Sequence, residues 1–194
     1  MPGYTNNTID ESIGLAVDSQ GNIYVSDKVN HRVMKWTPNA TSGTLAAGTG
    51  IQGSTNQQLS YPYGLYLDED NSYLYIADWN NHRIQRYRLG NSTIGTTVAG
   101  GNGMGNGSNQ LNEPYDVCVS KKTGDIYIAD KGNQRIQRWS PGATSGITII
   151  GTTGINTIDD GFLNAPSNVI LNNNETYLYV SELDNHRVKR YRLP

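Results

Sequence analysis

The sequence predicts an all-β protein assembled from four copies of one repeat, and three observations support this. The core Asn-His-Arg-Val/Ile, once with Gln for His, begins at Asn30, Asn81, Asn133 and Asn185, which are 51, 52 and 52 residues apart. Short apolar runs alternate with polar turns, and none of the runs is typical of a helix. A period of about 20–50 residues is typical of solenoids, propellers and arrays.

The second repeat shows the predicted strands most clearly. Gly64–Asp68 is a short apolar strand, and Tyr73–Ala77 is an unbroken apolar run that indicates a strand buried on both faces. Arg83–Arg88 alternates charged and apolar residues, which predicts one face in water. Thr93–Ala99 is the fourth strand, and a loop rich in Gly, Asn and Ser leads to the next repeat.

The other repeats follow the same order of strands. Their first strands are Gly14–Asp18, Asp116–Ser120 and Asn168–Asn172; the second Ile23–Ser26, Ile126–Ala129 and Leu178–Ser181; the third Arg32–Trp36, Arg135–Trp139 and Arg187–Tyr191; the fourth Thr44–Ala47 and Ile147–Ile150. Apolar content falls from the first strand to the fourth. Four antiparallel strands with this gradient describe a β-propeller blade. We therefore expect one propeller, or propeller segment, over residues 1–194, with blades at about 12–49, 62–100, 114–151 and 166–194.

The fourth repeat has no candidate for its outer strand. Asn7-Thr-Ile-Asp10 does not supply one, because it resembles the loop Asn156-Thr-Ile-Asp159. Three explanations stay open: a segment of a longer propeller, a four-bladed ring with an incomplete blade, or a strand edge that another copy fills in an oligomer or filament. An open strand edge also makes an isolated monomer prone to aggregation.

Composition argues against several classes of protein. The formal net charge is −2, so we expect no nucleic-acid partner and no attraction to anionic membranes. We expect the basic residues of the third strands, such as Arg83 and Arg135, to form a solvated band. The single cysteine, Cys118, allows no internal disulfide. No apolar run approaches the roughly 18 residues of a membrane span, and no signal peptide is recognisable.

Five Asn-x-Ser/Thr sequons predict N-glycosylation and an extracellular or secreted location. They lie at Asn6, Asn39, Asn91, Asn106 and Asn174. Their number is only a mild excess over chance.

The repeated turn resembles the motif of the NHL-repeat family of β-propellers. It reads Asp27-Lys-Val-Asn-His-Arg-Val, Asp78-Trp-Asn-Asn-His-Arg-Ile, Asp130-Lys-Gly-Asn-Gln-Arg-Ile and Glu182-Leu-Asp-Asn-His-Arg-Val. The resemblance covers nearly the whole chain and implies a propeller, usually of six blades. Its signature residues are Asp27, Asn30, His31, Arg32, Asp78, Asn81, His82, Arg83, Asp130, Asn133, Gln134, Arg135, Glu182, Asn185, His186 and Arg187.

The chemistry of this motif favours a structural role. An Arg can fork onto the carboxylate five residues before it, and Asn tolerates a positive φ in a turn. His31, His82 and His186 occupy equivalent positions on different blades, so they are too far apart to bind one metal ion.

Two regions are candidate binding sites. Loops after the fourth strands share one face with the motif turns, where we expect Trp79, Lys28, Lys131 and Leu183. Trp79 either belongs to a binding surface for a protein or glycan there or packs against the neighbouring turn. Gly48–Gly53 matches G-x-G-x-x-G, but no helix follows it, so we do not expect a dinucleotide site.

The second candidate lies at the inner ends of the first strands, at Tyr63, Tyr115, Asp116 and Asn168. Propeller enzymes that resemble this family hold a divalent cation there, and Asp116, Asn168 and Glu113 carry suitable oxygen atoms. Two of the four blades offer only glycine at this position, so we expect neither catalytic residues nor a metal or other cofactor.

The sequence thus predicts a non-enzymatic scaffold or a recognition module for a protein or glycan. We expect that it can self-associate through the open edge of the last blade. The alternative is a fragment of a metal-dependent, six-bladed enzyme of the amidating-lyase or lactonase type.

Overall fold

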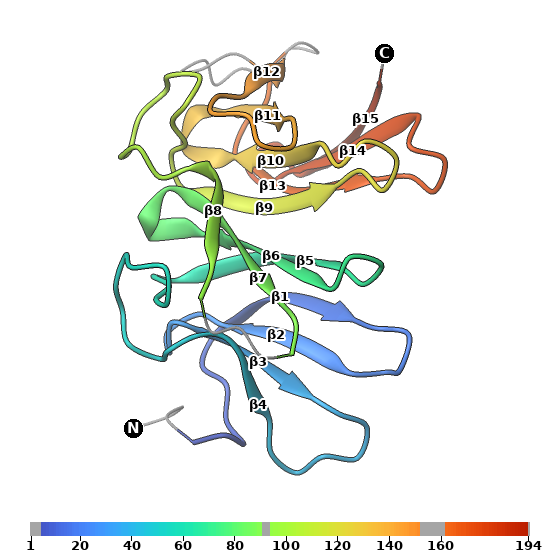
Figure 1. Ribbon diagram of the computed structural model, residues 1–194. Coiled ribbons are helices and arrows are strands. Elements are labelled where there is room, and N and C mark those ends of the chain that lie inside the picture. Colours follow the sequence, from blue (N-terminus) through green and yellow to red (C-terminus); the bar gives the residue numbers. More distant parts are fainter. Residues whose placement is uncertain (1–4, 91–93, 152–161, 194) are drawn as a thin grey trace. The chain divides into compact units, whose positions relative to one another are not determined.

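The computed structural model describes residues 5–90, 94–151 and 162–193, which form four antiparallel sheets (Figure 1). The strands are β1 (Ser12–Val17), β2 (Ile23–Asp27), β3 (Arg32–Trp36) and β4 (Thr44–Gly48); β5 (Pro62–Asp68), β6 (Tyr73–Asp78), β7 (Arg83–Arg88) and β8 (Thr96–Gly100); β9 (Pro114–Val119), β10 (Ile126–Asp130), β11 (Arg135–Trp139) and β12 (Ile147–Gly151); β13 (Pro166–Leu171), β14 (Tyr177–Glu182) and β15 (Arg187–Arg192).

Strands that follow one another in the chain are neighbours in each sheet, which is the up-and-down order of a propeller blade. The predicted fold class is confirmed: three sheets have four strands, and the described part of the last has three. The described helical segments are the three-residue 3₁₀ turns η1 (Trp79–Asn81) and η2 (Lys131–Asn133). Within the described ranges no helix is long and apolar enough to cross a membrane.

The strand boundaries depart from the prediction mainly at the first strand of each blade. In the last three blades these strands begin two residues earlier than predicted, at Pro62, Pro114 and Pro166. Proline is tolerated at the first residue of a strand, where its missing N–H disturbs no ladder. A shift in the pairing register follows each of these prolines, so the pattern of apolar residues begins only after the irregularity.

Internal contacts divide the chain into two compact units. The first contains residues 1–81 and 85–97, with the first sheet and most of the second. The other unit contains residues 82–84 and 98–194, with the third and fourth sheets. Each unit builds its own core between two sheets, as expected when a blade buries its faces against a neighbour.

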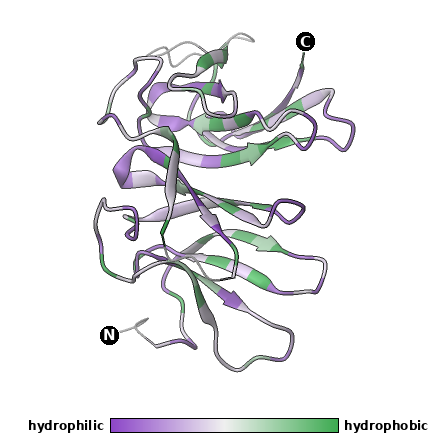
Figure 2. Ribbon diagram, in the orientation of Figure 1, coloured by the Kyte–Doolittle hydropathy of each residue, from purple (hydrophilic) through white to green (hydrophobic). Residues whose placement is uncertain are grey.

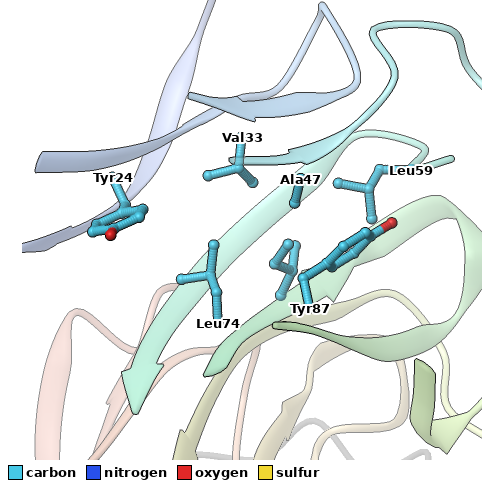
Figure 3. Close-up of a cluster of buried hydrophobic side chains, with 7 residues drawn as sticks. Tyr24, Val33, Ala47, Leu59, Leu74 and Tyr87 are labelled. Atoms are coloured by element: carbon cyan, nitrogen blue, oxygen red, sulfur yellow. The ribbon is translucent and has the colours of Figure 1, made fainter. Parts of the chain in front are cut away.

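The core of the first unit lies where the face of one sheet meets the face of the next. Figure 3 shows Tyr24, Val33 and Ala47 of the first sheet facing Leu74 and Tyr87 of the second. Leu59, from the loop between the sheets, fills the outer part of the same cluster. In Figure 2 the apolar residues follow the strands, and the loops are mostly hydrophilic. The cluster therefore comes from facing strands and one loop residue.

The second unit repeats this construction. Strand β9 lies beside β13, and β10 also contacts β13. Ile128, Ile136, Leu178 and Val180 are each completely buried. The single cysteine, Cys118, is a buried free thiol, and burial raises its pKa well above the ordinary value.

The acid of each repeat motif ends the second strand of its blade and is almost completely buried. Each carboxylate accepts a hydrogen bond from the motif Asn three residues later and from a backbone N–H in the loop that enters the blade. The two donors are Asn30 and the Asp10 N–H for Asp27, and Asn81 and the Ser60 N–H for Asp78. They are Asn133 and the Asn112 N–H for Asp130, and Asn185 and the Asn164 N–H for Glu182. Each acid thus joins the turn to the entering loop.

The motif arginine adds a buried ion pair to this arrangement. The Nε of Arg135 lies 2.7 Å from Asp130, and its remaining donors reach the loop carbonyls of Asn106, Gly107 and Gln110. Arg32 likewise bonds Asp27 and the carbonyls of residues 5 and 8. The predicted pairing of Arg with the acid is therefore present, but at Arg32 and Arg135 the described bond to the acid comes from Nε. A two-point fork is described at Arg187, whose Nε and second nitrogen both reach Glu182.

The expectation that the basic residues form a solvated band was wrong for Arg83 and Arg135, which are only 6% and 3% exposed. The Arg135 guanidinium pairs with the buried Asp130 carboxylate of its own blade instead of facing water. The third strands β3, β7 and β11 are mostly buried, and the predicted alternation is seen only in β15.

The motif histidine links one blade to the next. The Nδ1 of His31 accepts the N–H of Tyr61, and the Nδ1 of His82 accepts the N–H of Glu113, each at 3.1 Å. In the third repeat Gln134 Oε1 accepts the N–H of Ala165 at 2.8 Å. Gln therefore replaces His because both side chains offer an acceptor at this position.

The positive φ predicted for the motif Asn was wrong. It belongs to the next residue, with φ of 52° at His31 and 56° at Gln134. The N–H that each of them accepts also comes from a residue at positive φ, such as Tyr61 at 52°. Two uncommon backbone conformations thus meet in one hydrogen bond.

Replacing Arg135 by Ala should reduce the free energy of unfolding by about 3–5 kcal/mol, because the buried Asp130 carboxylate would lose its cation. Arg187→Ala is the matched control and should cost less, since the Arg187 side chain is 25% exposed and water can replace it. Urea denaturation at neutral pH measures both. Equal losses would contradict the role of burial.

His31→Gln should keep the folded protein stable and remove part of its pH dependence. Burial lowers the pKa of His31, and the Asp27 carboxylate opposes this only in part. The His31 contribution is therefore present above the unfolded pKa of about 6.5 and is lost as the pH falls through the lower folded pKa. On acidification the wild type should therefore lose unfolding free energy relative to H31Q, because Gln does not titrate. H31A should lose about 1–3 kcal/mol at pH 7.5, because it leaves the Tyr61 N–H without an acceptor.

Candidate interaction site

Five side chains of the first unit form a cluster that we call the aromatic patch: Lys28, His31, Tyr61, Tyr63 and Trp79. They come from the turn after β2, the entry to β5 and the start of η1. Tyr61 packs edge-on against His31 at 4.6 Å between ring centroids, and Trp79 lies 5.5 Å from Tyr63. The Lys28 Nζ lies 5.1 Å from the centre of the Tyr63 ring. This spacing is typical of aromatic and cation–π contacts.

The position of Trp79 combines the two alternatives left open by the sequence. Its ring packs against Tyr61 and Tyr63, but the residue stays half-buried, as do Tyr61 and Lys28. The indole Nε1–H is buried and finds no acceptor among the described residues. An aromatic group held by neighbours and partly open to solvent is preorganised for contact with a partner.

A salt bridge fixes the charged end of the patch. Lys28 donates to the Glu11 carboxylate at 2.6 Å, and this hydrogen bond is the main cause of the raised pKa of Lys28. The patch therefore presents rings beside a lysine that stays charged at neutral pH.

The second unit carries a reduced version of this arrangement. Lys131 follows its acid as Lys28 does and lies 4.1 Å from the centre of the Tyr115 ring. Leu183 occupies the position of Trp79 in the fourth repeat and is 51% exposed. Equivalent motif positions thus carry different surface chemistry on different blades.

Asp116 and Asn168, the two polar residues predicted at the inner strand ends, do meet. The Asp116 carboxylate accepts the backbone N–H of Val169 at 3.0 Å and the Asn168 amide at 3.4 Å. In the first unit the equivalent of Asp116 is Gly14, where an added Cβ would lie 2.3 Å from the Tyr63 carbonyl oxygen. Glycine at this position lets the first blade lie close to the backbone of the second blade. In the second unit the Asp116 carboxylate joins the third blade to the fourth by hydrogen bonds.

Burial raises the pKa of Asp116 to about 7, against the effect of the hydrogen bonds that it accepts. No cationic group contributes to this shift. A buried carboxyl group without a cation is expected to hold its proton close to neutral pH.

These residues do not fit a calcium site. A single carboxylate and one amide fall short of the six to eight oxygen ligands that Ca²⁺ takes. Across the described residues, no group of three or more His, Cys, Asp or Glu side chains could hold a metal ion. His31 and His82 use their Nδ1 atoms for backbone contacts.

Four of the five sequons lie in the described part of the chain. Asn6, Asn39, Asn106 and Asn174 are all exposed, whereas Asn91 lies outside the described residues. Exposure is compatible with glycosylation, which stays a prediction.

Sequence reasoning missed Tyr61 and His31 as members of the patch. Tyr61 lies in a loop and shows no strand periodicity. The available signal was its place directly before Pro62, repeated by Glu113 and Ala165 before their own prolines. Three equivalent positions before proline could have indicated a conserved backbone contact within the repeat.

Asp116→Asn should remove a pH dependence that the wild type shows between about pH 4 and 7. The folded pKa is raised, so the Asp116 contribution is full below the unfolded pKa of about 4 and is lost as the pH rises through about 7. Asn keeps an acceptor for Val169 and Asn168 without the charge. At pH 8 the variant should be more stable than wild type, on the order of 3 kcal/mol, by urea denaturation. A wild type that is no less stable at pH 8 than at pH 5, relative to D116N, would contradict the raised pKa.

Comparisons with known proteins agree with the repeat and its turn. A model described as "NHL repeat" matches residues 13–36 and 111–139, which contain the motif turns of the first and third blades. The other two blades carry an acid, Asp78 or Glu182, with Asn and Arg at the same spacing.

Two curated relatives and one solved structure illustrate the range of similar proteins. The chain is 26% identical to "NHL repeat-containing protein 2" of Homo sapiens over 175 residues, which cover 77% of this chain and 24% of that protein. It is 25% identical to the peptidyl-glycine alpha-amidating monooxygenase of Mus musculus over 127 residues, or 64% of this chain and 13% of that protein. A chain in the crystal structure of a nidogen/laminin complex superposes with a TM-score of 0.70 at 17% identity, covering 93% of this chain and 60% of that one.

The chain therefore spans a quarter or less of the length of these two curated relatives. The structural likeness, at this low identity, shows the fold alone. Together with the four motif turns and the four antiparallel blades, the comparisons establish that this chain belongs to the NHL-repeat family of β-propellers.

Proposed function

We propose that this chain is a recognition module without catalytic activity, which binds a protein partner through the aromatic patch. The observation that carries the proposal is the arrangement of Tyr61, Tyr63 and Trp79 beside Lys28, held in place by the His31 contact. Tyr and Trp supply most of the binding energy in many protein interfaces, because they offer large contact area at low entropic cost.

The fold and the relatives support the same proposal. Propellers present variable loops on a rigid scaffold, which is where binding residues usually lie. A chain in a nidogen/laminin complex, itself an assembly of proteins, shares the fold. The formal charge of −2 and the buried motif arginines give no basic face for nucleic acid.

A metal-dependent enzyme is the second candidate, because the chain is similar to an amidating monooxygenase and because Asp116 has a perturbed pKa. Perturbed groups often mark active sites. The hydrogen bonds of Asp116 explain its position without a metal, and few oxygen ligands surround it. Calorimetric titration with Ca²⁺ and Zn²⁺ tests this: heat of binding that D116A abolishes would favour the enzyme.

Three further features belong to the proposal. A glycan is an alternative occupant of the patch, since sugar rings also stack on Tyr and Trp. An extracellular location follows if the exposed sequons are glycosylated, which a mass decrease after glycosidase treatment of the native protein would reveal. Self-association through the outer edge of β15 remains a proposal, and within the described residues β15 is hydrogen-bonded to β14 only.

Trp79→Ala should abolish capture of the partner, because it removes the ring that holds the patch together. Leu183→Ala is the matched control: it changes the same motif position in the fourth repeat, where the residue is an exposed leucine. Immobilised wild type, W79A and L183A would be compared by quantitative mass spectrometry of the proteins captured from the native source.

We expect W79A to lose a partner that wild type and L183A retain, with a drop in affinity of about 30-fold or more. If the W79A variant still captured the partner, the aromatic patch would be excluded as the binding surface. Capture that glycosidase treatment of the partner abolishes would identify a glycan instead.

A further inference from the structure

The aromatic patch depends on one hydrogen bond between two blades. The Tyr61 N–H donates to the Nδ1 of His31 at 3.1 Å, and His31 is only 8% exposed. Because a backbone N–H can only donate, Nδ1 carries no proton in this contact and the ring is neutral. Protonation of His31 would turn Nδ1 into a donor. Two donors cannot bond each other, so the contact with Tyr61 exists only while His31 is neutral.

The backbone of Tyr61 depends on His31 more than its neighbours do. The Ser60 N–H donates to the Asp78 carboxylate at 2.7 Å, and Pro62 pairs with Asp78 in the second sheet. Tyr61 itself has a φ of 52°, which is an uncommon and strained conformation for a residue with a side chain. Loss of the bond to His31 would therefore free Tyr61 and leave the strands of the blade in place.

The Tyr61 side chain connects His31 to the rest of the patch. Its ring lies edge-on to His31 at 4.6 Å and edge-on to Trp79 at 6.2 Å between ring centroids. Trp79 in turn lies 5.5 Å from Tyr63. A displacement of Tyr61 removes the support of Trp79 on one side, so it changes the surface that a partner meets.

The charged groups on the turn of His31 favour its neutral form at pH 7. Burial lowers the pKa of His31, and the Asp27 carboxylate opposes this only in part. Asp27 is already paired with Arg32, which weakens its attraction for a second cation. Lys28, on the same turn, is paired with Glu11.

The side of the second sheet adds little charge to this contact. Residues 49–60, which form most of the loop between the two sheets, contain no charged side chain. Asp78 is fully buried and already accepts hydrogen bonds from a loop N–H and from the motif Asn. Tyr61 and Tyr63 are the titratable residues at the start of β5. The charge of His31 is thus decided by burial and by its own turn.

We propose that His31 is an acid-sensitive latch of the aromatic patch: the neutral ring holds Tyr61 in place for binding, and protonation releases Tyr61 and, with it, the partner. This regulation rests on the proposed function of the patch. The partner is held near neutral pH and set free in acid, within the range in which histidine titrates.

The repeat supplies a natural control for this latch. Gln134 occupies the position of His31 in the third blade, and its Oε1 accepts the Ala165 N–H at 2.8 Å. A side-chain amide does not titrate, so this contact keeps its acceptor on acidification. His31→Gln should therefore preserve the acceptor for Tyr61 and remove the response to acid.

Amide hydrogen exchange followed by NMR tests the latch without a partner. From about pH 7.5 to 4.5 the protection factor of the Tyr61 N–H, which is corrected for the intrinsic exchange rate, should fall about tenfold or more in the wild type. In H31Q it should stay constant, and the Ala165 N–H should stay constant in both proteins. The Trp79 indole N–H resonance should move with the same midpoint in the wild type only.

Release of the captured partner tests the consequence for binding. Immobilised wild type, loaded from the native source at about pH 7.5, should lose about tenfold or more in affinity at about pH 4.5. H31Q should retain the partner at both pH values. W79A, which tests the proposed function, should capture none at either.

Three results would count against the latch. Tyr61 protection that does not change with pH in the wild type would overturn it, even if W79A loses the partner as the proposed function requires. An H31Q variant that loses Tyr61 protection or its partner in acid as the wild type does would assign the response to another titrating group. If W79A retains the partner, the release of a partner falls with the proposed function, and the Tyr61 exchange still decides whether His31 holds the patch.

Discussion

The structure depends on one buried carboxylate in each blade. It lies where the second strand ends, and it accepts hydrogen bonds from the motif Asn and from a backbone N–H of the entering loop. In the first, third and fourth blades the motif Arg also donates to it. A buried charge is costly unless it is paired and hydrogen-bonded, so the three donors must be present together. The carboxylate thereby fixes the turn, the third strand and the path of the loop at one point. Glu182 performs the role of Asp: burial alone would raise its pKa, but hydrogen bonds from Arg187, Asn164 and Asn185 lower it.

The His or Gln that follows extends this local device to the neighbouring blade. It accepts one backbone N–H from a residue held at positive φ, so each turn positions the entry to the next first strand. This contact also orders Tyr61, and through Tyr61 the patch that contains Trp79. His31 therefore belongs both to the contact between two blades and to the patch for which we propose recognition.

The sequence predicted the blades well because their signals are local. Arg32, Arg83 and Arg135 begin their strands at the predicted residues, since a charged residue directly after the turn marks the boundary. The first strands were predicted too short because a proline and an irregular pair precede the apolar pattern. The burial of Arg83 and Arg135 was not predicted, because alternation along a strand says which residues share a face and not whether water reaches it.

By itself, the sequence determined the repeat, its four blades, and the acid, Asn and Arg that belong together in each turn, because these interactions join residues within five positions of one another. Only the tertiary structure decided what depends on residues tens of positions apart. It placed Tyr61 and Tyr63 around Trp79, joined Asp116 to Val169 and Asn168, and gave His31 its acceptor role. It also showed which apolar residues, such as Leu15 and Val188, stay uncovered, since burial depends on the neighbouring sheet and not on the strand's own pattern.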